Sequence, residues 1–437
     1  MAFIIRFAKG VRNHWKKSTF LASAVAYGVS YSNEKYEIKQ LMRHYCTEAS
    51  KYGEVVVGST QRLQKVLVLL NPAANRKSCE EDFHDYCEPI LHLAGFEVEI
   101  VKTDSEGHAR RYLEELAKLP DAIVVAGGDG TVSEVVSGLK RRGDGAECPI
   151  GVLPVGRTNG LATALFRTSD ETTTLEDVRA MANAAYAVVA GKKEKIDLMK
   201  IEVLPNEIDE KVPEKPVYAV GSLQWGAFRD ILTLRDKYWY TGSLRDYTAF
   251  LFNAFDGKHT WSCKAKLTYT DPCQGCSKCY KEHQHQQPKK EETKRWWSAF
   301  IPRANGTQGV DYSKIVNEQC SIPHELEVDP AELVLETTNA NLIGSNAQNS
   351  KLCVKIGTQV DSGFSFLNES WSRIWNRKFI DCPTEKLVEA RTVYLIPEKL
   401  QSNEEDSEAF YSIDSEAYEV RPVRVTVVPK SVEVFTF

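Results

Sequence analysis

The residues best placed to do chemistry are the glycines and the acid of the stretch G-G-D-G-T, which spans Gly127 to Thr131. Glycine lets the backbone approach a ligand closely, and N–H groups at the start of a helix bind phosphate. Asp129 carries the same charge as phosphate, so we expect it to hold Mg²⁺ or to accept a proton from a hydroxyl. The alternative is a tight strand-to-helix turn in which the acid is incidental.

A buried strand and an amphipathic helix must position this loop. The apolar, partly β-branched run Ala122–Ala126 predicts a strand buried on both faces. The helix predicted after the loop has apolar residues on one face, at Val132, Val135, Val136 and Leu139. Strand, glycine loop and helix in this order present backbone N–H groups to a phosphate.

Alternating strands and helices surround this unit. The other predicted strands are Lys65–Leu70, Phe96–Lys102 and Ile150–Pro154, and the predicted helices are Cys79–Leu93 and Gly107–Leu119. This alternation predicts a parallel sheet flanked by helices, in which ligands bind beyond the carboxyl ends of the strands. Four predicted strand ends should therefore meet in one site: Asn71, Thr103, Asp129 and Gly156.

The glycine loop after a buried strand resembles the diacylglycerol kinase catalytic family, which includes the sphingosine and ceramide kinases. Further stretches resemble its mitochondrial members that phosphorylate acylglycerols: R-N-H-W-K-K from Arg12, N-P-A-A from Asn71, P-I-L-H-L from Pro89, V-K-T-D-x-E-G from Val101, K-Y-W-Y from Lys237 and S-I-D-S-E-x-Y-E from Ser412. The resemblance implies transfer of the ATP γ-phosphoryl group, with Mg²⁺, to monoacylglycerol and diacylglycerol. The products would be lysophosphatidic and phosphatidic acids.

The resemblance also assigns roles to residues. It places nucleotide binding at Asn71, Thr103, Gly127, Gly128, Asp129, Gly130, Thr131, Gly156 and Asn159. Asp414 and Glu416 correspond to the family's D-G-E motif, which implies carboxylates near the acceptor hydroxyl and near nucleotide or metal. We predict Asp414 as general base and Asp129 as the metal and nucleotide organiser, although the two roles are interchangeable at this stage. The alternative for Asp414 and Glu416 is a solvated acidic loop without a functional role.

The chain departs from the family pattern at four positions. Asn75 replaces the glycine of N-P-x-x-G, and asparagine tolerates positive φ better than most residues. Arg157 and Thr158 stand where threonine and glycine are usual, and Ser415 replaces the glycine of D-G-E. Arg157 either stabilises phosphoryl charge or only reflects divergence of this loop's sequence from the family pattern. With these departures, an active site of reduced activity is one of the alternatives.

From about Lys193 the pattern changes to short alternating strands. They are predicted at Ile196–Val203, Val217–Gly221, Lys264–Tyr269, Leu333–Thr337, Leu352–Ile356, Arg391–Ile396 and Val423–Val428. This pattern predicts an antiparallel β-sandwich, and the resemblance implies that it closes over the nucleotide domain. Four residues resemble the family's acceptor-side segment, although core packing is the simpler interpretation of the two aromatics: Trp225, Gly226, Phe228 and Asp230.

A group of cysteines is a separate candidate. Cys273, Cys276 and Cys279, followed by His283 and His285, have the spacing of metal ligands. The polar stretch 271–317 around them predicts a disordered insertion, and no second C-x-x-C pair follows. Whether these cysteines bind a metal stays open. Eleven cysteines without a regular framework disfavour a disulfide-stapled secreted fold.

The N-terminal segment, residues 1–32, contains basic and apolar residues at roughly helical spacing and no acid before Glu34. It predicts a mitochondrial targeting or membrane-anchoring segment, or else a docked helix with a solvated basic face. We divide the rest into a helical connector (33–60), an ATP-binding domain (61–192) and a lipid-substrate domain (193–437). The resemblance implies the mitochondrial inner membrane, facing the intermembrane space, and partnership in the inner-membrane carrier translocase.

Composition limits the remaining alternatives. The 437 residues are 42% hydrophobic and 26% charged, as in an ordinary globular chain, and the longest apolar runs are too short for an ordinary membrane span. A net charge of −5 argues against nucleic-acid binding as the main role. Two rivals remain: a sphingosine or ceramide kinase, and a mainly non-catalytic subunit of a membrane assembly.

Overall fold

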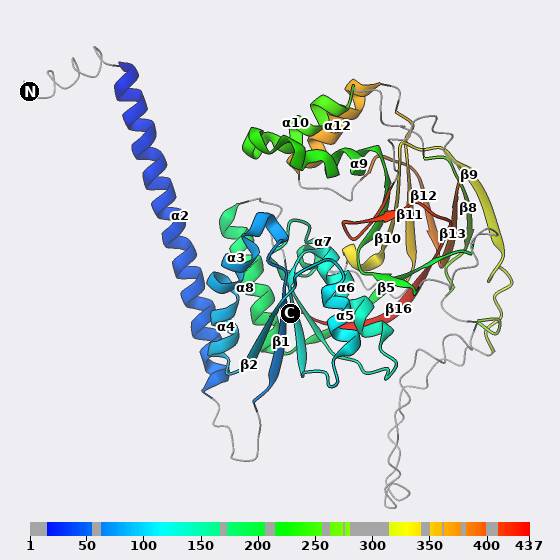
Figure 1. Ribbon diagram of the computed structural model, residues 1–437, viewed down its shortest axis with the longest axis horizontal. Coiled ribbons are helices and arrows are strands. Elements are labelled where there is room, and N and C mark those ends of the chain that lie inside the picture. Colours follow the sequence, from blue (N-terminus) through cyan, green and yellow to red (C-terminus); the bar gives the residue numbers. More distant parts are fainter. Residues whose placement is uncertain are drawn as a thin grey trace, which may run out of the picture.

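A computed structural model shows an α/β half and a β-rich half, with a long helix on the outside (Figure 1). The structure describes residues 15–54, 63–166, 173–205, 215–255, 263–273, 276–279, 314–341, 350–360, 362–376, 382–398 and 410–437. Most of the predicted insertion, residues 280–313, lies outside these ranges, as do His283 and His285.

The α/β half contains the predicted parallel sheet. Its strands are β1 (Lys65–Leu70), β2 (Glu97–Lys102), β3 (Ala122–Gly127) and β4 (Ile150–Pro154), in the order β2-β1-β3-β4. Its helices are η1 (Ala74–Lys77), α3 (Cys79–Tyr86), α4 (Glu88–Leu93), α5 (His108–Glu115), α6 (Asp129–Arg141), α7 (Gly160–Phe166) and α8 (Thr174–Ala190). Every residue of β3 is buried, because helices cover both faces of the sheet. The single helix predicted over 79–93 is wrong: Pro89, in the first turn of α4, separates α3 from α4.

The β-rich half is the predicted sandwich, made of two antiparallel sheets. The first contains β5 (Lys193–Val203), β6 (Val217–Ala219), β8 (Ala265–Thr270), β9 (Pro323–Val328), β13 (Thr392–Pro397) and β16 (Val423–Phe435). The second contains β7 (Ser222–Gly226), β10 (Glu332–Thr337), β11 (Leu352–Gly357), β12 (Thr384–Ala390), β14 (Phe410–Ile413) and β15 (Glu416–Glu419), and η5 (Thr338–Asn341) follows β10. Buried side chains of both sheets form one core, which includes Trp225.

One strand joins the two halves. β16 pairs with β5 and β13 in the sandwich, and Val434 near its end pairs in parallel with Ile150 of β4. The parallel sheet therefore continues into the first sheet of the sandwich. The two halves therefore share one continuous sheet.

A group of helices caps the second sheet (Figure 1). It consists of α9 (Ala227–Thr233), η2 (Leu234–Leu244), α10 (Arg245–Asn253) and α12 (Gly363–Trp375), none of which the strand pattern predicted. Phe228 is fully buried in its small apolar core, as the simpler interpretation of that residue expected. The buried Arg373 guanidinium donates to both carboxylate oxygens of Glu332 at 2.7 and 3.0 Å, which ties α12 to β10.

The long helix α2 (Trp15–Gly53) extends past the α/β half. Its second part packs on α4 and α8 through residues such as Ile38 and Ala49, and its first part is exposed. Among the described helices, none is both long and apolar enough to cross a membrane.

Candidate active site

A polar cleft of about 420 Å³ lies at the carboxyl ends of the parallel strands, where they meet the β-rich half and the helical cap. The predicted residues that line it are Asn71, Gly128, Gly130, Thr131, Asp414 and Glu416. The predicted residues outside its lining are Thr103, Gly127, Asp129, Gly156 and Asn159. The cleft thus brings together the glycine loop of the α/β half and the S-I-D-S-E motif of the β-rich half.

Two glycine loops form the floor of the cleft by direct backbone contact. A Cβ on Gly156 would lie 2.3 Å from the Cα of Gly128, so a side chain at Gly156 is sterically forbidden. The Asn159 amide donates to the carbonyl oxygens of Pro154 and Gly156 at 3.3 and 2.8 Å. Gly156 and Asn159 therefore shape the loop that supports Gly128, rather than reaching the cleft themselves.

The Asp129 side chain is buried behind the two glycine loops and does not line the cleft. It is 6% exposed, and its two carboxylate oxygens accept hydrogen bonds from the N–H groups of Gly160 (2.8 Å) and Leu161 (3.3 Å) in the first turn of α7. Burial raises the pKa of Asp129, and these two hydrogen bonds oppose that change. The carboxylate joins the starts of α6 and α7, so the geometry does not favour direct Mg²⁺ coordination by Asp129.

Asp414 and Ser415 form the two-residue turn between β14 and β15. Their φ angles are +47° and +75°, as a type I′ hairpin turn requires. The Asp414 carboxylate is 3% exposed and accepts hydrogen bonds from three successive N–H groups of Val220–Ser222, at 2.7, 3.0 and 2.8 Å. Burial, with the nearby charge of Asp129, raises the pKa of Asp414 to about 7. These contacts favour a positioning role for Asp414 over the predicted role of general base.

Glu416 lines the cleft, as Asp414 does, but it is partly exposed whereas Asp414 is buried. Tyr418 donates a hydrogen bond to its carboxylate at 3.0 Å. Burial, followed by repulsion from Glu134, raises the pKa of Glu416 to about 8. Glu134, in the second turn of α6, also accepts from the N–H of Gly107 at 2.8 Å. We did not predict Glu134, although its place on the helix after the glycine loop was a usable signal.

Three arginines give the cleft its positive charge: Arg157, Arg229 and Arg235. Arg157 forms an ion pair with Asp236 (3.7 Å), and Arg229 donates to the carbonyl oxygen of Ser415 (2.8 Å). Burial and the charge of Arg157 lower the pKa of Arg235 to about 10, and burial and Arg157 also lower that of Arg229. Mutual repulsion of guanidinium groups around one cavity is relieved by an anion, so this side of the cleft fits phosphate.

The departures from the family pattern have clear positions. Asn75 adopts φ +45°, the conformation for which asparagine is suited. Arg157 and Thr158 line the cleft, and the Ser415 hydroxyl donates to that of Thr158 at 2.9 Å. Two positions that are usually glycine in the family therefore contact each other across the two halves.

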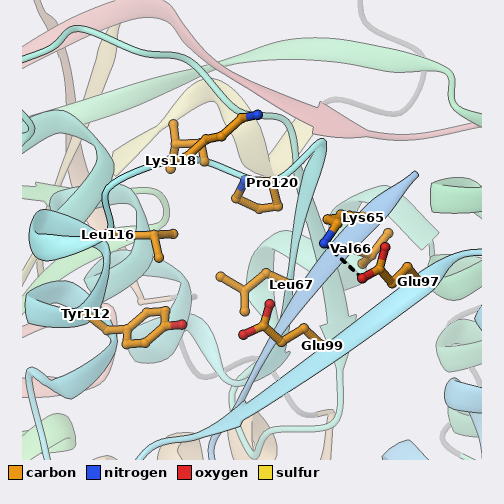
Figure 2. A pocket seen from close by; sticks show the side chains of 10 residues that line it. Lys65, Val66, Leu67, Glu97, Glu99, Tyr112, Leu116, Lys118 and Pro120 are labelled. Atoms are coloured by element: carbon orange, nitrogen blue, oxygen red, sulfur yellow. Dashed lines mark ion pairs between the residues drawn. The ribbon is translucent and has the colours of Figure 1, made fainter. Parts of the chain in front are cut away.

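A second hollow, of about 270 Å³, lies at the opposite edge of the parallel sheet. Figure 2 shows Lys65 at the start of β1 paired with Glu97 of β2, with Pro120 and Leu116 on the other side. The Lys65–Glu97 distance is 2.9 Å. Because ligands of such sheets bind at the carboxyl ends of the strands, this hollow is a poor candidate for the site.

Comparisons with known proteins agree with this geometry. Residues 65–201 match the family model of the diacylglycerol kinase catalytic domain, and residues 220–437 match that of the acylglycerol kinase C-terminal region. The chain is 32% identical to "Acylglycerol kinase, mitochondrial" of Homo sapiens over 434 residues, which are 98% of this chain and 96% of that protein.

Two more distant similarities bear on the fold and on the rival substrate. A structure described as a diacylglycerol kinase, from Bacillus anthracis str. Sterne, aligns with a TM-score of 0.50 at 14% identity, over 86% of this chain and 99% of its own, and shows the same fold. "Sphingoid long-chain bases kinase 1" of Arabidopsis thaliana is 31% identical over 40% of this chain and 21% of its own length. The predicted family is confirmed, and the chain belongs to the acylglycerol kinase family of lipid kinases.

Proposed function

We propose that this lipid kinase transfers the γ-phosphoryl group of ATP to the free hydroxyl of monoacylglycerol and diacylglycerol, giving lysophosphatidic and phosphatidic acids. The observation that carries the proposal is one cleft that is lined by three arginines, a glycine loop and Glu416. Arginines and loop N–H groups stabilise phosphate, and a carboxylate accepts the proton of an attacking hydroxyl.

The nucleotide side of the cleft is formed by the start of α6. The N–H groups of Gly128, Gly130 and Thr131 lie at a helix N-terminus, where phosphate binds, whereas that of Asp129 donates to the carbonyl oxygen of Thr158 at 2.9 Å. The Asn71 amide donates to the Thr131 hydroxyl at 3.1 Å, which orients both side chains. Thr103 follows β2 at the same edge, and its N–H donates to the carbonyl oxygen of Leu70 (2.9 Å). We place the phosphates over α6 and the rest of the nucleotide toward Asn71 and Thr103.

On the acceptor side we assign the proton acceptor to Glu416 and a positioning role to Asp414. A pKa of about 8 lies near the working pH, where a general base is most effective. Carboxylate oxygens are the donors that Mg²⁺ prefers, and the Glu134 carboxylate beside Glu416 would hold the ion better than Asp129 does, which leaves Glu416 to accept the proton. When bound with the nucleotide, Mg²⁺ supplies neutralisation of phosphate charge.

The test measures ATP-dependent phosphorylation of monoacylglycerol, diacylglycerol and sphingosine by the full chain with Mg²⁺, for Glu416→Gln and Asp414→Asn. We expect Glu416→Gln to lower kcat about a hundredfold or more at unchanged Tm, because it removes the proton acceptor. Asp414→Asn should lower both kcat and Tm. Glu419→Gln, on the exposed part of β15, is the matched control. Full activity of Glu416→Gln refutes its role, and a preference for sphingosine refutes the substrate assignment.

Exposed aromatic residues support a membrane-bound substrate. The helical cap beside the cleft carries aromatic side chains that are each more than half exposed: Trp239, Tyr240, Phe252, Phe364 and Trp375. Aromatic rings of this kind favour the boundary between water and lipid. We therefore propose that the cap contacts the membrane from which the acylglycerol enters the cleft.

We further propose the mitochondrial inner membrane, on the side of the intermembrane space, as the location. The relative's name includes "mitochondrial", and the basic N-terminal segment supports targeting or anchoring. The exposed first part of α2 offers a surface for protein partners, so partnership in the carrier translocase stays a second proposal. Fractionation with protease protection tests the location. Affinity capture with the full chain tests the partnership, which the absence of translocase subunits among the captured proteins would refute.

A further inference from the structure

Four cysteines gather outside the cleft, at the connection between β8 and β9. Their sulfur atoms all lie within 4.8 Å of one another, and the four residues are Cys273, Cys276, Cys279 and Cys320. The spacing in the sequence identified the first three. The fold adds Cys320 as the fourth candidate ligand, a position for which the sequence had offered only His283 or His285. Within the described residues, the group consists of these four cysteines alone.

The sulfur separations match a tetrahedral metal site. Cys276 Sγ lies 3.7 Å from Cys279 Sγ, which lies 3.8 Å from Cys273 Sγ. Four sulfurs bound at about 2.3 Å to one tetrahedral Zn²⁺ stand about 3.8 Å apart, whereas a disulfide needs about 2.05 Å. Three of the cysteines are buried, and Cys273 is partly buried. The cluster is thus a preformed set of four sulfur ligands.

Polar side chains contact two of the four sulfurs. The Asn317 amide donates to Cys273 Sγ at 3.5 Å, and the Ser321 hydroxyl lies 3.5 Å from Cys320 Sγ. Four thiolates around Zn²⁺ leave a net negative charge, which such donors stabilise. These contacts orient the sulfurs before any ion binds.

The position in the fold explains what an ion would do there. Cys273 follows the end of β8, Cys320 precedes the start of β9, and Thr270 and Pro323 are the last paired residues of the two strands. The segments already meet through the N–H of Ser277, which donates to the carbonyl oxygen of Ile315 at 2.7 Å. A metal at the cluster would close a long connection at its base and hold the edge strand β9 on the sheet.

We propose that Cys273, Cys276, Cys279 and Cys320 bind one structural Zn²⁺ that fastens the β8–β9 connection. Four protein ligands leave no open position, so the ion is structural rather than catalytic. None of the residues that line the active-site cleft belongs to the described part of this connection. The site is therefore separate from the kinase reaction and from any Mg²⁺ bound there.

The test measures zinc in the full-length chain, purified without chelator, by inductively coupled plasma mass spectrometry. We expect about one zinc per chain in the wild type and less than about a tenth of that in Cys320→Ser, because a closed site that loses one thiolate no longer binds tightly. Cys353→Ser is the matched control, since this cysteine lies on β11 outside the cluster, and it should keep the wild-type zinc content.

A second measurement uses the wild type alone, so that misfolding of a variant cannot obscure the result. Removal of zinc by a strong chelator should make the four cysteines of the cluster reactive toward iodoacetamide together, as read by peptide mass spectrometry, with the other cysteines unchanged. Wild-type protein without zinc overturns the proposal. Iron in its place, a disulfide between any two of the four, or full zinc content in Cys320→Ser also overturns it.

Discussion

Substitution of Gly130 by alanine tests how closely the two halves of the active site must meet. A Cβ at this position would lie 3.0 Å from Cγ and Oε1 of Glu416 and 3.2 Å from the carbonyl oxygen of Asp414. Ordinary contacts begin at 3.4 Å, so the turn must retreat by about 0.4 Å. The Glu416 side chain can rotate, but three hydrogen bonds hold the Asp414 carboxylate in place. The strain therefore falls on the position of Glu416.

A displacement of about 1 Å in a catalytic group can cost about a hundredfold in rate, so we expect Gly130→Ala to lower kcat by about tenfold. The assay is steady-state phosphorylation of monoacylglycerol in mixed micelles. Gly143→Ala is the matched control, because a Cβ on Gly143, just beyond α6, meets no atom within 4 Å. Thermal unfolding of both variants separates a catalytic effect from a loss of fold. A kcat for Gly130→Ala within about twofold of the Gly143→Ala value would refute the close-contact argument.

Three further predictions concern stability. Ser415→Gly should raise the free energy of unfolding by roughly 0.5–1 kcal/mol in urea titration, because glycine adopts positive φ without strain and the lost hydrogen bond to Thr158 is exposed. Arg373→Met should lower it by about 3–5 kcal/mol, since Glu332 is left buried without a partner. Burial raises the pKa of Asp230 to about 7, above its unfolded value of about 4, so its stabilising contribution is complete below about pH 4 and lost as pH rises through about 7. Asp230→Asn should reduce the fall in the free energy of unfolding with rising pH. Equal slopes of this free energy against pH for variant and wild type between pH 5 and pH 8 would contradict the prediction.

The sequence identified the parallel sheet and its catalytic edge because their signals are local. The strand of Ala122–Ala126 is apolar on both faces, which only a doubly covered strand tolerates, and Asp129 follows it directly. Strand ends in a parallel sheet meet at one edge, so Asn71 and Gly130 could be placed together without knowledge of the register. The same logic could not tell that Asp129 faces α7 rather than the cleft, because a side chain's direction depends on contacts that only the tertiary fold supplies.

The helical cap and its arginines escaped prediction for a different reason. The aromatic residues of α10, including Phe250, favour strands as readily as helices in a short segment. Their core is completed by Phe366 of α12, far along the chain. No sequence motif marks Arg229 or Arg235. Only the tertiary fold shows that α9 and η2 place them in the same cleft as the glycine loop. Cys320 joined the cysteine cluster in the same way, through strand pairing rather than spacing.

The departures from the family pattern do not indicate a weakened site. Asn75 replaces a glycine and adopts the positive φ that asparagine tolerates. Thr158 and Ser415 replace two glycines, but their hydroxyl groups meet at 2.9 Å across the boundary between the halves. They therefore act as one coupled change that adds a contact where the turn approaches the loop. Ser415 also keeps the left-handed conformation that the type I′ turn needs, and Glu416 after it lines the cleft.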